Sequence, residues 1–118
     1  AVILSKKRAN TIPEWEPISE RLLRVRFDSK HCKLTLIQCY APTNDTDDDI
    51  KNAWYDQLQA IVSKVPQHDM LMVLGDMNAK VGSDNSNNDR IMGKHECGVV
   101  NENGQRLIDF CANNNLVI

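Results

Sequence analysis

The sequence contains no long apolar run. Its longest, Met70–Leu74, falls far short of the roughly 20 apolar residues that a membrane-spanning helix needs. The opening run, Ala1–Leu4, is followed rather than preceded by basic residues, and it is too short for the apolar part of a signal peptide. We therefore expect neither an export signal nor a membrane among the partners of this protein.

An excess of charge of either sign is also absent. The 118 residues carry 14 Lys and Arg against 16 Asp and Glu, a formal net charge of −2. Proteins that bind nucleic acid through a strong basic field need a clear excess of positive charge, so this chain alone is excluded from that class. A substrate that carries phosphate would have to be held by a local site.

Cysteine is too sparse for a disulfide scaffold. The four cysteines, at 32, 39, 97 and 111, include no CxxC pair. Small secreted scaffolds are denser in cysteine than this, so we expect reduced thiols in an intracellular protein of the nucleus or the cytoplasm. A zinc site built on His95 and Cys97 lacks the paired ligand spacing of such sites.

Both ends of the chain are apolar. Ala1–Leu4 and Leu116–Ile118 are predicted to be strands, whereas natural termini are usually polar and exposed. No linker or internal repeat divides the sequence. We therefore expect residues 1–118 to be the central fragment of one domain, truncated at both ends, with exposed strand edges that favour self-association.

The apolar periodicity of the first two thirds predicts an α/β protein. Alternating residues predict strands at 23–27 and 34–40, joined by a short turn into an antiparallel hairpin. An apolar stripe predicts a helix over 46–65, which Pro66 ends. The run at 70–74 is apolar throughout, so it predicts a strand buried on both faces.

The last third is polar until a second helix. Residues 82–105 are rich in Gly, Asn, Asp and Ser and are predicted to form a long loop. Asn103 is predicted to cap a helix whose Leu107 and Ile108 face inward. Three asparagines at 113–115 are expected to close that helix.

The strand–helix–strand unit brings polar side chains together. Such units are almost always right-handed crossovers between parallel strands, whose carboxyl ends share one edge of the sheet. Tyr40 ends the first strand, while Asp76 and Asn78 follow the second, with Asn78 on the same side if the chain stays extended. A carboxylate, an amide and a phenol can position water against a phosphodiester. A turn-capping Asp, an Asx-turn Asn and a strand-end Tyr remain equally open on spacing alone.

Two segments of this unit carry a resemblance to a known family. Ile37–Thr43 (IQCYAPT) and Val73–Ala79 (VLGDMNA) resemble the central part of the endonuclease/exonuclease/phosphatase superfamily, which includes deoxyribonuclease I. Four further segments resemble the endonuclease domain of LINE retrotransposons of the RTE/BovB group: IPEWEP at 12–17, KVGSDN at 80–85, MGKH at 92–95 and NENG at 101–104. The resemblance covers essentially the whole chain.

The resemblance implies a partial four-layer α/β sandwich of the deoxyribonuclease I type with a mixed sheet. It also implies a monomeric enzyme that, as a complete domain, uses Mg²⁺ to hydrolyse phosphodiester bonds and nicks target DNA. Asp76 would then orient or activate the attacking water, with Asn78 and Tyr40 on the phosphate. Thr43 and Asn44 fall where the family's loop touches its DNA substrate.

The chain also departs from the family pattern. The family's metal-binding Glu and an Asn lie upstream of Ala1, and its Asp-His pair with a further Asp lies after Ile118. His31, His68 and His95 do not stand in the family's sequence context, so no metal ligand is assigned. Without these groups the charge on the phosphoryl oxygens is not neutralised, so we expect the chain alone to be inactive.

The sequence also bears on three other functions. An EF-hand calcium module fails because Ile50 and Asp89 stand where its loop needs Gly. A phosphatase or phosphodiesterase acting on a small phosphorylated substrate would use the same Asp76 and Asn78. A domesticated or decaying remnant without catalytic activity stays open as well.

Overall fold

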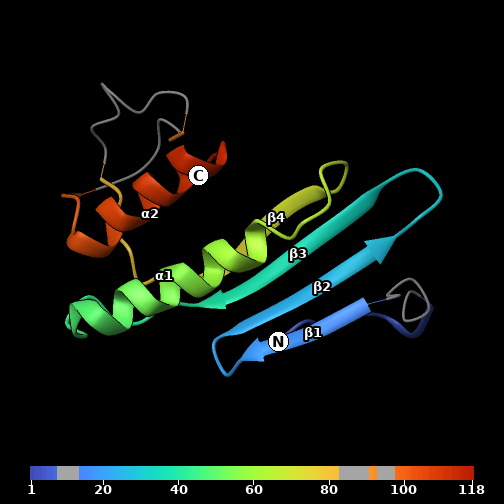
Figure 1. Cartoon of the computed structure of the whole chain (residues 1–118), viewed down its shortest axis with the longest axis horizontal. Coiled ribbons are helices and arrows are strands. Elements are labelled where there is room, and N and C mark those ends of the chain that lie inside the picture. Colours follow the sequence, from blue (N-terminus) through green and yellow to red (C-terminus); the bar gives the residue numbers. More distant parts are fainter. Residues whose placement is uncertain (8–13, 83–90, 93–97) are drawn as a thin grey trace. The chain divides into compact units, whose positions relative to one another are not determined.

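The computed structural model describes residues 1–7, 14–82, 91–92 and 98–118 (Figure 1). The elements follow one another as β1 (Glu14–Ser19), β2 (Leu22–Asp28), β3 (Lys33–Tyr40), α1 (Asp48–Val62), β4 (Met70–Asp76) and α2 (Glu102–Asn114). This is a mixed α/β fold compatible with a partial α/β sandwich, as expected. The chain divides into two compact units, one made of Ala1–Tyr40 and Ala60–Asp76, the other of Ala41–Gln59 and Met77–Ile118.

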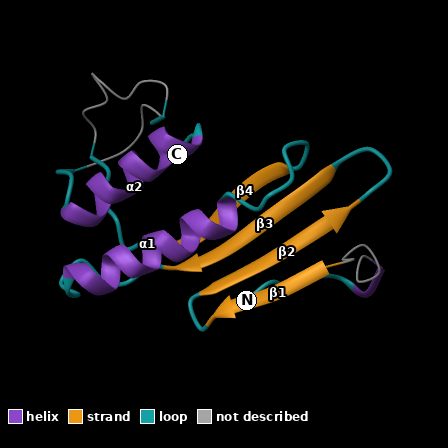
Figure 2. Ribbon diagram, in the orientation of Figure 1, coloured by secondary structure: helices purple, strands orange, loops and turns teal. Residues whose placement is uncertain are grey.

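The first unit contains a four-stranded mixed sheet in the order β1-β2-β3-β4 (Figure 2). β2 and β3 pair antiparallel, which confirms the predicted hairpin, and β3 and β4 pair parallel, which confirms the relation expected of a strand–helix–strand unit. Leu22, Ile37 and Cys39 share one face of the sheet, and each is at most 1% exposed. The alternating residues Leu23, Val25 and Phe27 of β2 lie on the other face, where Val25 is buried and the other two are half-buried.

The sheet begins with a strand that the sequence did not reveal. The run Ala1–Leu4, predicted as a strand, has no regular structure, and β1 forms instead in the polar stretch that follows. Arg24 of β2 forms ion pairs with Glu14 and Glu16 of β1. Pro17 is tolerated because β1 is an edge strand whose register shifts just after this residue. Cross-strand charge pairs therefore support this strand, rather than apolar content.

β4 forms where it was predicted, but the prediction that it is buried on both faces is wrong. Met70, Met72 and Leu74 alternate along it and are 58%, 42% and 45% exposed. Within the part of the chain that the structure describes, no strand pairs with the outer edge of β4. An apolar run indicates a buried strand only where neighbours cover both faces, and the run itself carries no information about them.

α1 is shorter than the helix predicted over 46–65. Its first turn carries two acidic residues, which stabilise the positive end of the helix dipole. Trp54, Leu58 and Ile61 form the buried stripe, whereas Ile50, expected in that stripe, is 54% exposed. The helix ends before the proline that was predicted to stop it.

α2 begins earlier than predicted because a different asparagine caps it. Asn101, not Asn103, is the N-cap, and its Oδ1 accepts a hydrogen bond from the backbone N–H of Gly104 at 2.8 Å. Most of the loop predicted over 82–105 lies outside the described residues, and its last four residues belong to α2 instead. Asn115 adopts the left-handed conformation with φ of 54° and ends the helix, as expected of the asparagine run.

Some predictions concern segments outside these elements. Leu116–Ile118, predicted as a strand, forms none. The cysteines that the structure describes are free thiols, whereas His95 and Cys97 lie outside the described residues. In the described ranges, no helix is both long enough and apolar enough to cross a lipid bilayer.

Candidate functional site

β3 and β4 end at a pair of polar residues. Tyr40 is the last residue of β3 and Asp76 the last of β4, and the parallel register makes them direct partners. Directly paired residues of a sheet present their side chains on the same face. Tyr40 is 50% exposed and Asp76 is exposed as well. The structure thus brings together two of the three residues that were expected to converge.

A glycine sets how closely the two strand ends approach each other. Gly75, the register partner of Cys39, has a φ of 141°, and a Cβ built on it would lie 1.9 Å from the Cys39 carbonyl oxygen. No side chain fits there unless β4 moves away from β3. The residue before Asp76 therefore determines where Asp76 leaves the sheet.

Arg21 adds a positive charge that the sequence analysis did not assign to this edge. Its guanidinium carbon lies 4.9 Å from the centroid of the Tyr40 ring, within cation–π range, and its carbonyl oxygen accepts the Tyr40 N–H at 2.9 Å. Among the residues that the structure describes, no carboxylate forms an ion pair with Arg21. The hairpin register offered a signal, because Leu22 pairs with Cys39 and residue 21 therefore falls beside Tyr40.

Asn78 departs from the geometry predicted for it. Its φ of 46° lies in the left-handed region, so the assumption that the chain stays extended beyond β4 is wrong. Asn78 belongs to the second unit, where its Nδ2 donates a hydrogen bond to the Ala41 carbonyl oxygen at 2.8 Å. The residue thereby connects the segment after β4 to the segment after β3.

Asn103 occupies the centre of the same cluster in the second unit. It is 2% exposed, and its Nδ2 donates to the carbonyl oxygens of Pro42 and Asn78, both at 3.0 Å. The sequence analysis assigned this residue only a capping role. Its position in the sequence could have indicated its burial. Asn103 stands four residues before Leu107, on the same side of an amphipathic helix, and that side faces the core.

The two residues predicted to touch DNA differ in their surroundings. Thr43 is exposed, and its hydroxyl lies 3.0 Å from that of Thr46. The Oδ1 of Asn44 accepts the backbone N–H of Asn103 at 3.1 Å. Thr43 is therefore accessible to a ligand, whereas the side chain of Asn44 holds its own loop against α2.

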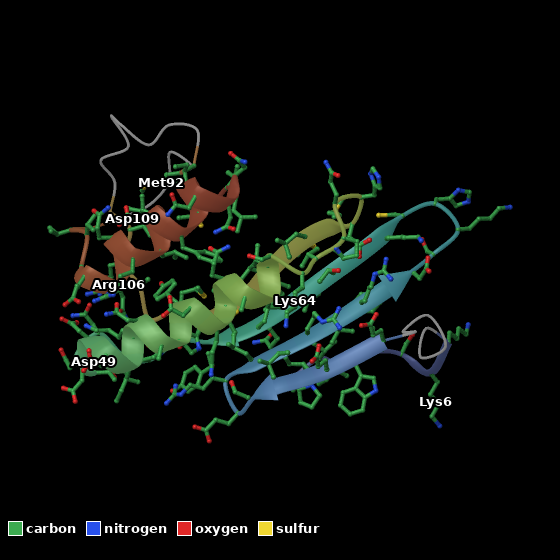
Figure 3. The ribbon with its side chains drawn as sticks, viewed as in Figure 1. Lys6, Asp49, Lys64, Met92, Arg106 and Asp109 are labelled. Carbon is green, nitrogen blue, oxygen red and sulfur yellow. The ribbon has the colours of Figure 1, made fainter. Side chains whose placement is uncertain are left out.

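An ion-pair cluster joins the first turns of α1 and α2. Lys51, 2% exposed, contacts Asp48 at 3.1 Å and Glu102 at 3.0 Å, and Arg106 (Figure 3) contacts the same two carboxylates at 3.1 and 3.0 Å. Burial disfavours the ammonium group, but its hydrogen bonds to Glu102 and Asp48 outweigh this and raise the pKa of Lys51. The Lys51 ammonium also donates to the Asn44 carbonyl oxygen at 3.0 Å, so the cluster fixes the loop after β3.

A Mg²⁺ ion at this edge would need oxygen ligands beside Asp76. In the ranges that the structure covers, no three His, Cys, Asp or Glu side chains lie together as a metal site would require. Mg²⁺ is usually held by one or two carboxylates together with waters and substrate phosphates, so Asp76 supplies at most part of such a site. The described residues therefore do not fit a complete metal centre on their own.

Comparison with known proteins gives a homologue but no family. No family model matches the chain. Over all 118 residues the chain is 40% identical to craniofacial development protein 2 of Bos taurus and 39% identical to craniofacial development protein 2 of Tragulus javanicus. The matches cover 20% of each relative, so the chain spans about a fifth of the length of the curated relatives it matches. The chain is thus homologous to part of craniofacial development protein 2.

Proposed function

We propose that this chain forms part of a metal-dependent endonuclease that nicks DNA by hydrolysing a phosphodiester bond, as the endonucleases of non-LTR retrotransposons do. The observation that carries the proposal is the pairing of Tyr40 with Asp76 at the carboxyl ends of two parallel strands. Open α/β sheets bind their ligands at this edge. The YAPT and GDMN segments around both residues support the same function.

Each polar residue has a distinct role in this proposal. The Asp76 carboxylate orients the attacking water and accepts one of its protons, as a general base does. The Tyr40 phenol donates a hydrogen bond to a phosphoryl oxygen, on which negative charge grows in the transition state. The amide of Asn78, two residues after Asp76, donates to another phosphoryl oxygen.

DNA is favoured over a small phosphorylated substrate by the surroundings of the pair. Arg21 lies over the Tyr40 ring and forms no ion pair within the described ranges, so its guanidinium is available to a backbone phosphate. Thr43 is exposed, and it stands where the loop of the resembling endonucleases touches DNA. A small substrate would leave both side chains unused.

The metal belongs to the complete protein. Bound Mg²⁺ would neutralise charge on the phosphoryl oxygens, and the ligands that Asp76 does not supply would come from chain outside these 118 residues. We expect the enzyme to act as a monomer, on DNA in the nucleus or the cytoplasm. The 118-residue chain alone is then expected not to cleave DNA at a useful rate.

The test is a supercoiled-plasmid nicking assay in Mg²⁺ with protein expressed from the full reading frame that contains this chain. Asp76→Asn is expected to lower the nicking rate by about 100-fold or more, because the general base is lost. Asp109→Asn, on the exposed side of α2, is the matched control and should nick at the wild-type rate. If the protein hydrolyses a small phosphodiester but does not nick the plasmid, the small phosphodiester rather than DNA is its substrate. Nicking by the 118-residue chain that disappears with Asp76→Asn would contradict the expected inactivity of that chain.

A further inference from the structure

We propose that Asn103 is a positioning residue that sets the geometry of Asn78 for phosphate binding. The inference rests on the proposed function, since it gives Asn103 a part in the same site. Asn103 is buried and does not itself meet the substrate. It acts by holding two backbone carbonyl groups in the segments that follow β3 and β4.

The hydrogen bonds of Asn103 connect the segment that follows β3 with the segment that follows β4. Its side-chain amide donates to Pro42 O and Asn78 O at 3.0 Å each, and its backbone N–H donates to Asn44 Oδ1 at 3.1 Å. Asn78 Nδ2 in turn donates to Ala41 O at 2.8 Å. The carbonyl and the side chain of Asn78 are thus both tied to fixed partners, which holds the residue in its left-handed conformation.

The amide of Asn103 has a single compatible orientation. Both groups facing its Nδ2 are carbonyl oxygens, so a flipped amide would set Oδ1 against two acceptors. In the observed orientation, Oδ1 is buried and has no hydrogen-bond partner among the described residues. An unpaired buried acceptor is unfavourable, whereas the two hydrogen bonds that the amide donates are favourable and satisfy carbonyl oxygens of two segments. The two donors are what the position requires, and they act on the Pro42 and Asn78 carbonyls.

The helix that carries Asn103 is itself docked two residues beyond Asn78. Lys80 N donates to Asn101 Oδ1, and Asn101 N donates to Lys80 O, both at 3.0 Å. Gly104 allows this contact, because a Cβ built on it would lie 1.9 Å from Lys80 O. The first turn of α2 is therefore a rigid base from which Asn103 acts.

Two asparagines in one turn allow a matched test. Within the described residues, the Asn103 side chain donates to two carbonyl oxygens, whereas the Asn101 side chain accepts from Gly104 N and Lys80 N. Asn103→Asp removes both donors without changing side-chain size, while Asn101→Asp retains the accepting oxygen. In protein from the full reading frame, Asn103→Asp is expected to lower kcat for plasmid nicking by about 10- to 100-fold, because the phosphate donor is displaced. The Kd for DNA should change by less than about twofold, since in this proposal the Asn78 donor strengthens its hydrogen bond mainly as charge grows on the phosphoryl oxygen in the transition state.

Asn101→Asp is expected to retain wild-type kcat and Kd. Equal loss in both variants would mean that the first turn of α2 has only a structural role, and unchanged kcat in a folded Asn103→Asp protein would also overturn the proposal.

A second measurement needs neither a variant nor activity. In the wild-type protein, the Asn103 Nδ2 hydrogens should exchange slowly in NMR and show couplings across hydrogen bonds to the carbonyl carbons of Pro42 and Asn78. If the wild-type protein does not nick DNA but these signals are present, the endonuclease assignment fails while the positioning geometry stands. Rapid exchange of the Asn103 amide overturns the positioning role whether or not DNA is nicked.

Discussion

The guanidinium of Arg26 donates two hydrogen bonds to the carboxylate of Asp69, from Nε at 2.7 Å and from Nη2 at 3.0 Å. The hydroxyl of Thr35 donates to the same carboxylate at 2.8 Å. Arg26 and Thr35 are register partners on β2 and β3, and Asp69 directly precedes β4. The carboxylate therefore ties the start of β4 to its neighbour β3 and to β2, the next strand of the sheet, at the end of the sheet opposite to Tyr40.

This contact predicts an acid-sensitive step in stability. The hydrogen bonds from Arg26 and Thr35 outweigh burial and lower the pKa of Asp69 to about 2. Because the pKa is lower in the folded protein, the stabilisation is complete above the unfolded-state pKa of about 3.9 and is lost as the pH falls through about 2. Asp69→Asn should lower the free energy of unfolding at pH 7 and remove its decline between about pH 4 and 2. Urea unfolding followed by circular dichroism measures both effects.

The control for this experiment is Asp109→Asn, at an exposed position of α2. It should keep the wild-type pH dependence of stability between pH 7 and pH 2. If the free energy of unfolding of Asp69→Asn still falls between about pH 4 and 2 as it does in the wild type, other carboxylates govern acid unfolding.

Gly75 gives a second prediction, about the strand end that carries Asp76. A Cβ at this position would meet the Cys39 carbonyl oxygen at 1.9 Å, in a backbone with φ of 141°. Gly75→Ala should lower the free energy of unfolding by at least about 2 kcal/mol, because both the clash and the backbone strain oppose it. Gly98→Ala is matched for positive φ, at 98°, but no atom of the described residues lies within 4 Å of the new Cβ. This variant should lower the free energy of unfolding by only about 1 kcal/mol, and equal decreases in the two variants would reject the steric explanation.

Thiol reactivity gives a third prediction. Burial raises the pKa of Cys39 to about 12 and that of Cys111 to about 11, whereas Cys32 is exposed. Only the thiolate reacts with iodoacetamide, so at pH 8 Cys39 should react on the order of 1,000-fold more slowly than Cys32 in the folded protein. Peptide mass spectrometry reads each site separately, and in urea the three rates should converge. Rapid labelling of Cys39 without urea would contradict the burial of β3.

Much of this fold could be predicted from periodicity. The alternation of Leu23, Val25 and Phe27 predicted β2, and the four-residue spacing of Trp54 and Leu58 predicted α1. These patterns suffice because they record apolar side chains that the fold covers, which in β2 include Leu22 and Val25 on opposite faces of the strand. β1 was missed for the same reason: its residues are exposed, and it depends on pairing with a partner strand that only the tertiary structure supplies.

The candidate site was predictable to a smaller extent. The pairing of Tyr40 with Asp76 followed from a general rule about parallel strands, so the sequence order was enough. Asn103 was misassigned because Asn101 and Asn103 are both good capping residues, and the choice depends on which one the docked helix buries. The left-handed conformation of Asn78 likewise depends on hydrogen bonds between segments distant in the sequence.

The exposed edge of β4 gives the last prediction. Met70, Met72 and Leu74 leave apolar surface on a strand whose outer edge is unpaired within the described ranges, and this combination promotes pairing with another chain. We expect the 118-residue chain to self-associate through β4, and a lysine on the edge strand to oppose this by charge repulsion and hydration. Met72→Lys should weaken association at least about tenfold in sedimentation velocity. Gln57→Lys adds the same charge at an exposed position of α1 and should associate like the wild type. If both variants associate equally weakly, net charge rather than the β4 edge controls association, and if neither weakens it, another surface does.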